Sequence, residues 1–159
     1  MRKIIVTVAA VVVLVVGSVW WEFFHTKTFE ARLLAEHRHA QLREILAIVQ
    51  KNPRICIVST EEVGIPTCGG SQPTERDLRD AARLRQVLAE IPANYVSTTG
   101  DGEGKLGFVT IEVFEQGLLA PPAEIEWTAS HERRFGDYPR CVPLSMPGWA
   151  VCPGKLIFL

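Results

Sequence analysis

The sequence lacks an excess of charge of either sign. Its 159 residues contain 17 Lys and Arg against 18 Asp and Glu, so the formal net charge is −1. Proteins that bind nucleic acid through its phosphates depend on clustered basic side chains, which displace counterions. We therefore expect no nucleic acid among the partners.

Motifs for several common activities are also missing. No Gly-rich segment ends in the Lys and Ser or Thr of a phosphate loop, and no G-x-S-x-G sequence occurs. His37 and His39 lie two residues apart in a predicted helix, so they point in nearly opposite directions and cannot hold one metal ion together. We expect no metal and no cofactor. The chain has no N-x-Ser/Thr glycosylation site, which is compatible with a bacterial origin.

One long apolar run is present. Of the 18 residues from Ile4 to Trp21, only Thr7, Gly17 and Ser18 are not strongly apolar. As a helix this run is about 27 Å long, close to the thickness of the hydrocarbon core of a membrane. We predict a transmembrane signal-anchor in residues 1–24, with residues 4–21 inside the membrane.

The charges beside this run predict its orientation. Arg2 and Lys3 precede the run, and the positive-inside rule then keeps the N-terminus in the cytoplasm. We expect a single-pass protein of the inner (cytoplasmic) membrane, whose remaining residues lie in the periplasm or outside the cell.

A cleaved secretory signal is the alternative, because Arg2 and Lys3 form a charged start and Gly17-Ser18 supplies small residues. Three features favour a retained anchor. The apolar run is longer than the usual signal core of about 7–15 residues, no Ala-x-Ala follows it, and Trp20-Trp21 is typical of the aromatic belt of a membrane protein.

The four cysteines all follow the apolar run, at Cys56, Cys68, Cys141 and Cys152. An even number of cysteines in an exported segment indicates disulfides, and four cysteines allow three pairings. Pairing by proximity gives Cys56–Cys68 and Cys141–Cys152, and each bond would stabilise the fold by roughly 3 kcal/mol. A zinc site is the alternative, but no C-x-x-C pair is present.

The rest of the chain predicts an α+β fold: the transmembrane helix continues into a helical stalk (25–41), and a small, mainly antiparallel sheet with one packed helix follows in an extracytoplasmic domain (42–159). The pattern is helical from residue 26 to 51, without Gly or Pro, and again from Thr74, where a capping box is expected, to Pro92. Strands are predicted at 54–59, 94–99, 105–115, 123–128 and 155–159. Residues 60–73 and 130–154 are predicted to be loops.

The densest polar cluster lies in the second of these loops, at His131, Glu132, Arg133 and Arg134. Together with the aromatic ring of Trp149, this cluster is a candidate interaction surface. A hydrolase or ligand-binding enzyme that uses the His131 region is the alternative, although neighbours in sequence do not by themselves form a catalytic geometry.

The overall layout is a long N-terminal helix, partly in the membrane, followed by a strand-rich domain with cysteines near the C-terminus. This layout resembles that of pilins and pseudopilins, which implies a pilin-like subunit as one alternative. The chain lacks their charged leader before Phe-Thr-Leu-Ile-Glu, so the resemblance assigns no residue roles. Our preferred hypothesis is a non-enzymatic accessory protein, anchored in the membrane, that binds a protein partner on the extracytoplasmic side in a bacterial envelope assembly.

Overall fold

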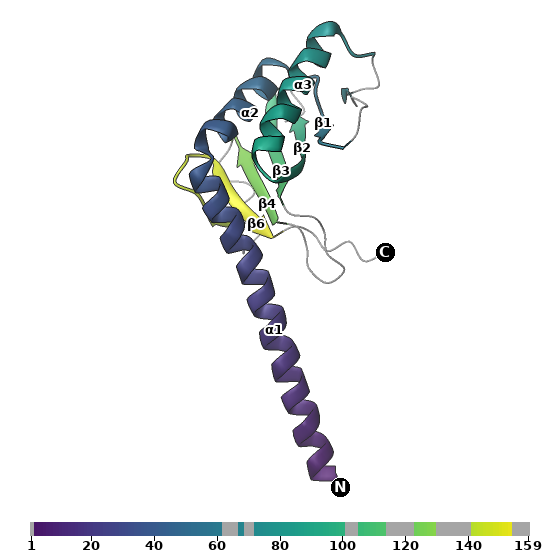
Figure 1. Ribbon diagram of the computed structural model, residues 1–159, viewed down its shortest axis with the longest axis vertical. Coiled ribbons are helices and arrows are strands. Elements are labelled where there is room, and N and C mark those ends of the chain that lie inside the picture. Colours follow the sequence, from purple (N-terminus) through teal and green to yellow (C-terminus); the bar gives the residue numbers. More distant parts are fainter. Residues whose placement is uncertain are drawn as a thin grey trace.

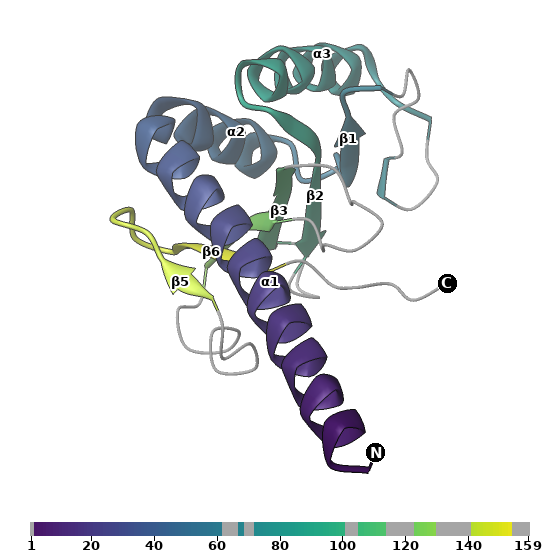
Figure 2. The ribbon, with the colours of Figure 1, turned by 60° about the horizontal axis from the view of Figure 1, so that its bottom comes forward.

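The computed structural model has an α+β fold in which three helices lie against one six-stranded antiparallel sheet (Figures 1 and 2). It describes residues 2–61, 67–68, 72–100, 105–113, 123–129 and 141–153, without the side chains of residues 2–10 and 19–27. The predicted class and the mainly antiparallel sheet are confirmed, but three helical segments pack on the sheet where one was expected.

The first helix, α1 (Arg2–His37), projects far from the sheet at its N-terminal end (Figure 1). Its last turns lie against strands β4 and β6, and Ala31 and Ala35 are fully buried there. Small alanine side chains allow the helix to approach the sheet closely. Within the predicted stalk, this part of the chain is therefore packed on the domain and is not free in solvent.

The second helix, α2 (His39–Lys51), is separated from α1 by Arg38, although we predicted one continuous helix. Arg38 leaves the helical conformation with φ −120° and ψ 29°. The apolar side chains on the two sides explain this corner. Ala31 and Ala35 pack at one end of the sheet, whereas Leu42 and Ile45 pack beside α3, so a straight helix could not bury both pairs.

The third helix, α3 (Glu75–Glu90), begins with the predicted capping box. The Thr74 hydroxyl accepts a hydrogen bond from the Asp77 backbone N–H (3.2 Å), and the Asp77 carboxylate accepts one from the Thr74 N–H (2.8 Å). This reciprocal pair satisfies two N–H groups that a helix end otherwise leaves open. Ala81, Leu84 and Leu88, which recur at helical spacing, form the inward face of this helix and are buried.

The sheet has the strand order β1-β2-β3-β4-β6-β5. Every neighbouring pair is antiparallel, and the strands are β1 (Ile57–Ser59), β2 (Ala93–Gly100), β3 (Leu106–Val113), β4 (Ala123–Thr128), β5 (Val142–Pro143) and β6 (Trp149–Pro153). The first four match predicted strands, and β4 matches at both ends.

The register separates an apolar face from a polar face. Ile111 lies opposite Val96 and Ile125, and all three side chains belong to the core that the helices cover. The next residue, Glu112, lies opposite Tyr95 and Glu124 on the other face, because successive side chains of a strand alternate.

Two strands, β5 and β6, lie in the segment that we predicted as a loop, so this prediction is wrong for residues 142–143 and 149–153. The four residues from Trp149 to Cys152 are all buried, so β6 lacks the alternation that marks a half-exposed strand. Gly148 precedes it with φ +82°, and a Cβ there would lie 2.9 Å from the Trp127 ring nitrogen. The predicted strand at 155–159 lies outside the described residues.

In the part of the chain whose side chains are described, no helix is both long enough and apolar enough to cross a membrane. The transmembrane anchor therefore stays a prediction from the sequence.

Candidate functional site

Both disulfides form, and the pairing predicted by proximity is confirmed. Cys56 is bonded to Cys68 and Cys141 to Cys152, with Cα–Cα distances of 5.3 and 4.2 Å. No cysteine remains as a free thiol. The predicted extracytoplasmic cysteine set thus acts as two separate staples.

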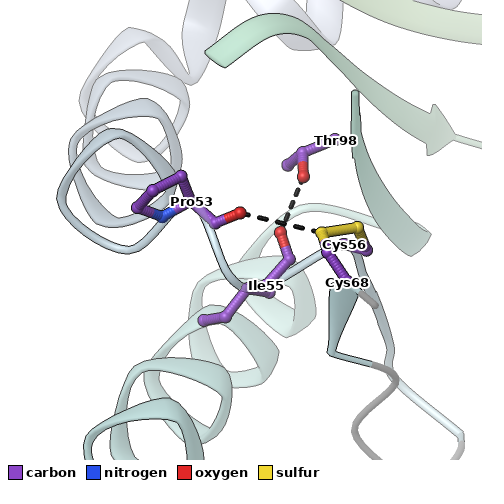
Figure 3. The surroundings of a disulfide bond; sticks show 5 residues. All are labelled: Pro53, Ile55, Cys56, Cys68 and Thr98. Carbon is purple, nitrogen blue, oxygen red and sulfur yellow. Dashed lines mark hydrogen bonds between the residues drawn. A yellow bond between two sulfur atoms is a disulfide. The ribbon is translucent and has the colours of Figure 1, made fainter. Parts of the chain in front are cut away.

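The Cys56–Cys68 disulfide lies beside the edge strand β1 (Figure 3). Ile55 forms an isolated bridge with Thr67, and the Cys68 N–H donates to the Arg54 carbonyl at 2.9 Å. On the sheet side, the Thr98 hydroxyl donates to the Ile55 carbonyl at 2.6 Å. The disulfide therefore fastens the segment that contains Thr67 and Cys68 to the chain beside the edge strand β1.

The Cys141–Cys152 disulfide crosses from the start of β5 to β6 on the polar face of the sheet. The Leu144 N–H donates to the Trp149 carbonyl, so these two residues form a hydrogen-bonded pair. In an antiparallel ladder, hydrogen-bonded and non-hydrogen-bonded pairs alternate along the strands. Three positions further along, Cys141 and Cys152 therefore face one another in a non-hydrogen-bonded pair. Side chains are closest in such pairs, which suits a disulfide. The same alternation leaves Pro143 at a position where the ladder needs no N–H from it.

A carboxyl group lies next to this second disulfide. An oxygen of Glu126 is 3.4 Å from the Cys152 sulfur, and Glu126 is buried, with 7% of its surface exposed. Among the described residues, Glu126, Cys141 and Cys152 bring ligand-type atoms within 4.8 Å of one another. Both sulfurs are used in the disulfide, so neither is a thiolate that could bind a metal ion.

Of the predicted interaction surface, His131, Glu132, Arg133 and Arg134 lie outside the described residues. Trp149 is described, and its side chain is only 3% exposed. It lies opposite Trp127 across β4 and β6 and belongs to the hydrophobic core. The Trp149 ring therefore offers no exposed apolar surface, because the helix-covered face of the sheet encloses it.

A carboxylate, an imidazole and a hydroxyl come together at the corner between α1 and α2. Glu36 accepts hydrogen bonds from the Ser145 hydroxyl and, at 3.0 Å, from the Ser145 N–H. The His39 Nε2 lies 3.0 Å from Glu36 and 3.3 Å from the Ser145 hydroxyl. More than 100 residues separate Ser145 from the other two, so no sequence motif indicates this cluster.

This cluster does not have the geometry of a catalytic triad. In a triad, the carboxylate and the nucleophile contact opposite nitrogens of the imidazole, so that the imidazole can take the hydroxyl proton. Here both contact Nε2, and the Ser145 hydroxyl donates to Glu36. The contacts instead fasten the β5–β6 turn to the corner of the helices.

The Ser145 hydrogen bonds lower the pKa of Glu36, with the side-chain hydroxyl as the largest cause. We expect Ser145→Ala to raise this pKa towards its ordinary value of 4.5, because a donor to the charged form is lost. NMR titration of the Glu36 carboxyl carbon measures the change. Ser145→Thr keeps a hydroxyl and is the matched control; an unchanged pKa in the alanine variant would contradict the assigned contact.

A second polar network joins the end of α2 to the start of α3. The buried Asn52 amide donates to Asp77 and to Asp80, each at 2.9 Å, and the Arg54 guanidinium lies 3.4 Å from Asp77. Asp77 is only 1% exposed. The Thr74 N–H is the main cause that lowers the pKa of Asp77 from 3.8 to about 2, followed by Asn52.

The lowered pKa of Asp77 predicts a loss of stability in acid. The charged form is favoured in the folded state, so this stabilisation is complete above pH 3.8 and is lost as the pH falls towards 2. We expect the urea midpoint to fall across this interval, and to fall less steeply in Asp77→Asn. Equal slopes in the two proteins would show that Asp77 contributes nothing to the acid sensitivity.

The polar face of the sheet carries a tyrosine, Tyr95, on the same row as two acidic side chains. Burial and the negative charges of Glu112 and Glu124 raise the pKa of Tyr95 to about 12. Glu112 also accepts a hydrogen bond from the Asn94 amide at 3.2 Å. The phenol is therefore a hydrogen-bonding group and not a base at neutral pH.

Among the side chains that the structure describes, the most exposed apolar ones lie on α1. The six residues from Val11 to Val16 have between 53% and 72% of their surface exposed. Six consecutive residues surround the whole circumference of a helix, because each is turned by about 100° from the last. This segment is apolar on every side, whereas a surface helix of a globular protein is apolar on one.

Comparisons with known proteins give no relative from which to transfer a function: no protein-family model, no curated protein and no solved structure matches the chain.

Proposed function

We propose that the protein is a non-enzymatic accessory protein of a bacterial envelope, anchored in the inner membrane by residues 4–21. Its domain lies on the extracytoplasmic side and binds a protein partner. One observation carries the proposal: the segment from Val11 to Val16, exposed and apolar all round, belongs to the same helix whose last turns are buried in the domain.

An apolar segment of this kind has two stable environments, the interior of a large protein and the hydrocarbon of a membrane. The chain offers no second apolar layer among the described residues near Val11–Val16. The surrounding sequence extends the apolar run to 18 residues, which follow Arg2 and Lys3 and end in Trp20-Trp21. Lipid is therefore the proposed environment.

The helix continues without a break from Arg2 to His37. Ala31 lies ten residues beyond Trp21, which places this buried contact about 15 Å beyond the end of the apolar run. A continuous helix fixes the orientation of the domain relative to the membrane. An accessory protein that presents a binding surface to a partner requires such a fixed orientation. Phe29 and Leu33, one turn apart and 59% and 45% exposed, are the proposed contact with the partner.

The pilin-like alternative is favoured by one specific observation, the packing of the end of α1 on strands β4 and β6. In such an assembly the long helices of many copies would pack together. Electron microscopy of the purified protein distinguishes the two proposals, because only the pilin-like one expects filaments.

Mass spectrometry of the protein extracted from membranes tests the proposal. An intact N-terminus, with four cysteines that alkylate only after reduction, is the expected result. A chain that begins near Trp20 would refute the anchor, and cysteines that alkylate without reduction would refute the extracytoplasmic location.

A further inference from the structure

The two disulfides differ in how far a reagent can reach them. Cys68 is exposed and Cys56 is half-buried, whereas Cys152 is only 2% exposed beside a half-buried Cys141. Exchange needs the attacking thiolate to reach one sulfur of the bond directly. Cys68 offers such an approach from solvent.

The chemical surroundings of the two disulfides also make Cys56–Cys68 the easier bond for a thiolate to open. The Cys152 sulfur lies 3.4 Å from the carboxyl group of Glu126, and a carboxylate there repels an arriving thiolate and disfavours a departing one. The Cys68 sulfur lies 3.7 Å from the Pro53 carbonyl oxygen, which is uncharged (Figure 3). This oxygen can accept a hydrogen bond from the S–H group of a reduced Cys68, so the thiol form has a partner already in place.

The sheet does not depend on the first disulfide for its register. The Thr98 N–H donates to the Cys56 carbonyl at 2.7 Å, and the Thr98 hydroxyl donates to the neighbouring Ile55 carbonyl (Figure 3). These hydrogen bonds hold the Cys56 side on β2 when the sulfur bond is open. The Cys68 side keeps its N–H bond to the Arg54 carbonyl.

We propose that Cys56–Cys68 is a site of thiol–disulfide exchange with the dithiol of an oxidoreductase, and that Cys141–Cys152 stays closed as a structural staple. A partner thiolate bonds to the Cys68 sulfur, and Cys56 leaves as a thiolate and takes a proton. The second partner thiolate then attacks the partner's sulfur in the mixed disulfide, and Cys68 leaves as a thiolate and also takes a proton. Two electrons pass from the dithiol, which becomes a disulfide, to the protein.

Timed reduction of the folded, full-length protein in detergent measures the difference. The protein is incubated with dithiothreitol and quenched with iodoacetamide at intervals. Full reduction in denaturant and labelling with N-ethylmaleimide then show, for each cysteine, the fraction already open. We expect Cys56 and Cys68 to open at least about tenfold faster than Cys141 and Cys152. Equal rates, or the reverse order, would overturn the proposal.

Three further measurements separate exchange at this site from general unfolding. In 8 M urea the two pairs should open at similar rates, because the difference in access is lost. Reduced thioredoxin without its resolving cysteine should form a mixed disulfide that peptide mapping places on Cys68. An adduct on Cys141 or Cys152 would refute the assignment, as would no adduct under conditions in which dithiothreitol opens Cys56–Cys68. Glu126→Gln should accelerate opening of Cys141–Cys152 alone.

Discussion

Replacing Cys141 and Cys152 together by serine should lower the free energy of unfolding by about 3–5 kcal/mol. Opening a loop of this length accounts for about 3 kcal/mol in the loop-entropy model. The rest arises because Cys152 is buried, and a serine hydroxyl there costs about 1–2 kcal/mol unless it donates a hydrogen bond to Glu126. Urea unfolding followed by circular dichroism measures the change, and the midpoint of thermal unfolding should fall by about 10 °C or more.

The other disulfide provides a matched control. Cys56 and Cys68 are separated by 12 residues, against 11 for Cys141 and Cys152, so the loop entropy is almost the same. Cys68 is exposed, so serine at that end of the bond stays hydrated. We therefore expect the Cys56→Ser, Cys68→Ser variant to lose only about 3 kcal/mol. If both variants lose the same free energy, burial of Cys152 does not matter to stability.

The elements with a complete local pattern were predictable. Helix α3 has a capping box at Thr74 and Asp77 and an apolar face with helical spacing, so both its start and its inward side follow from the sequence. Strand β4 alternates Ile125 with Glu124 and Glu126, so its apolar face and its polar face follow from the sequence. In both cases the pattern is local: it involves residues within one or two helical turns, or within a few positions along a strand.

The elements that were missed depend on distant parts of the chain. The corner at Arg38 has no Gly or Pro to indicate it, since it arises from packing against the sheet and from the contact of Glu36 with Ser145. Strand β6 is buried on both faces, so its sequence does not alternate. Both features are consequences of tertiary structure that no local window contains.

The same distinction applies to the site. The disulfide pairing could be predicted, because short loops favour cysteines that are close in sequence. The proximity of Glu126 to Cys152 could not, because it requires the pairing of β4 with β6. That pairing makes the two disulfides chemically different, and the different reactivity proposed for them follows from it.

Charges placed in the exposed apolar segment should have the largest effect of all on where the protein resides. We expect Val13→Arg, Leu14→Arg to remove most of the protein from the membrane fraction. Each arginine at the centre of a membrane helix costs about 2.5–3.5 kcal/mol on the insertion scale, so two oppose insertion strongly. Flotation of the membranes on a density gradient, followed by immunoblotting, measures the distribution.

The matched control is Val13→Leu, Leu14→Val, which changes shape but keeps the segment apolar, and it should float as the original protein does. Residues 13 and 14 lie more than ten residues before Ala31, so neither variant touches the core of the domain. Both proteins in detergent should therefore share one urea midpoint. If the double arginine variant still floats and resists alkaline carbonate, lipid is not what surrounds Val11–Val16. The exposed apolar helix must then be covered by another protein, and the proposed anchor becomes a proposed interface.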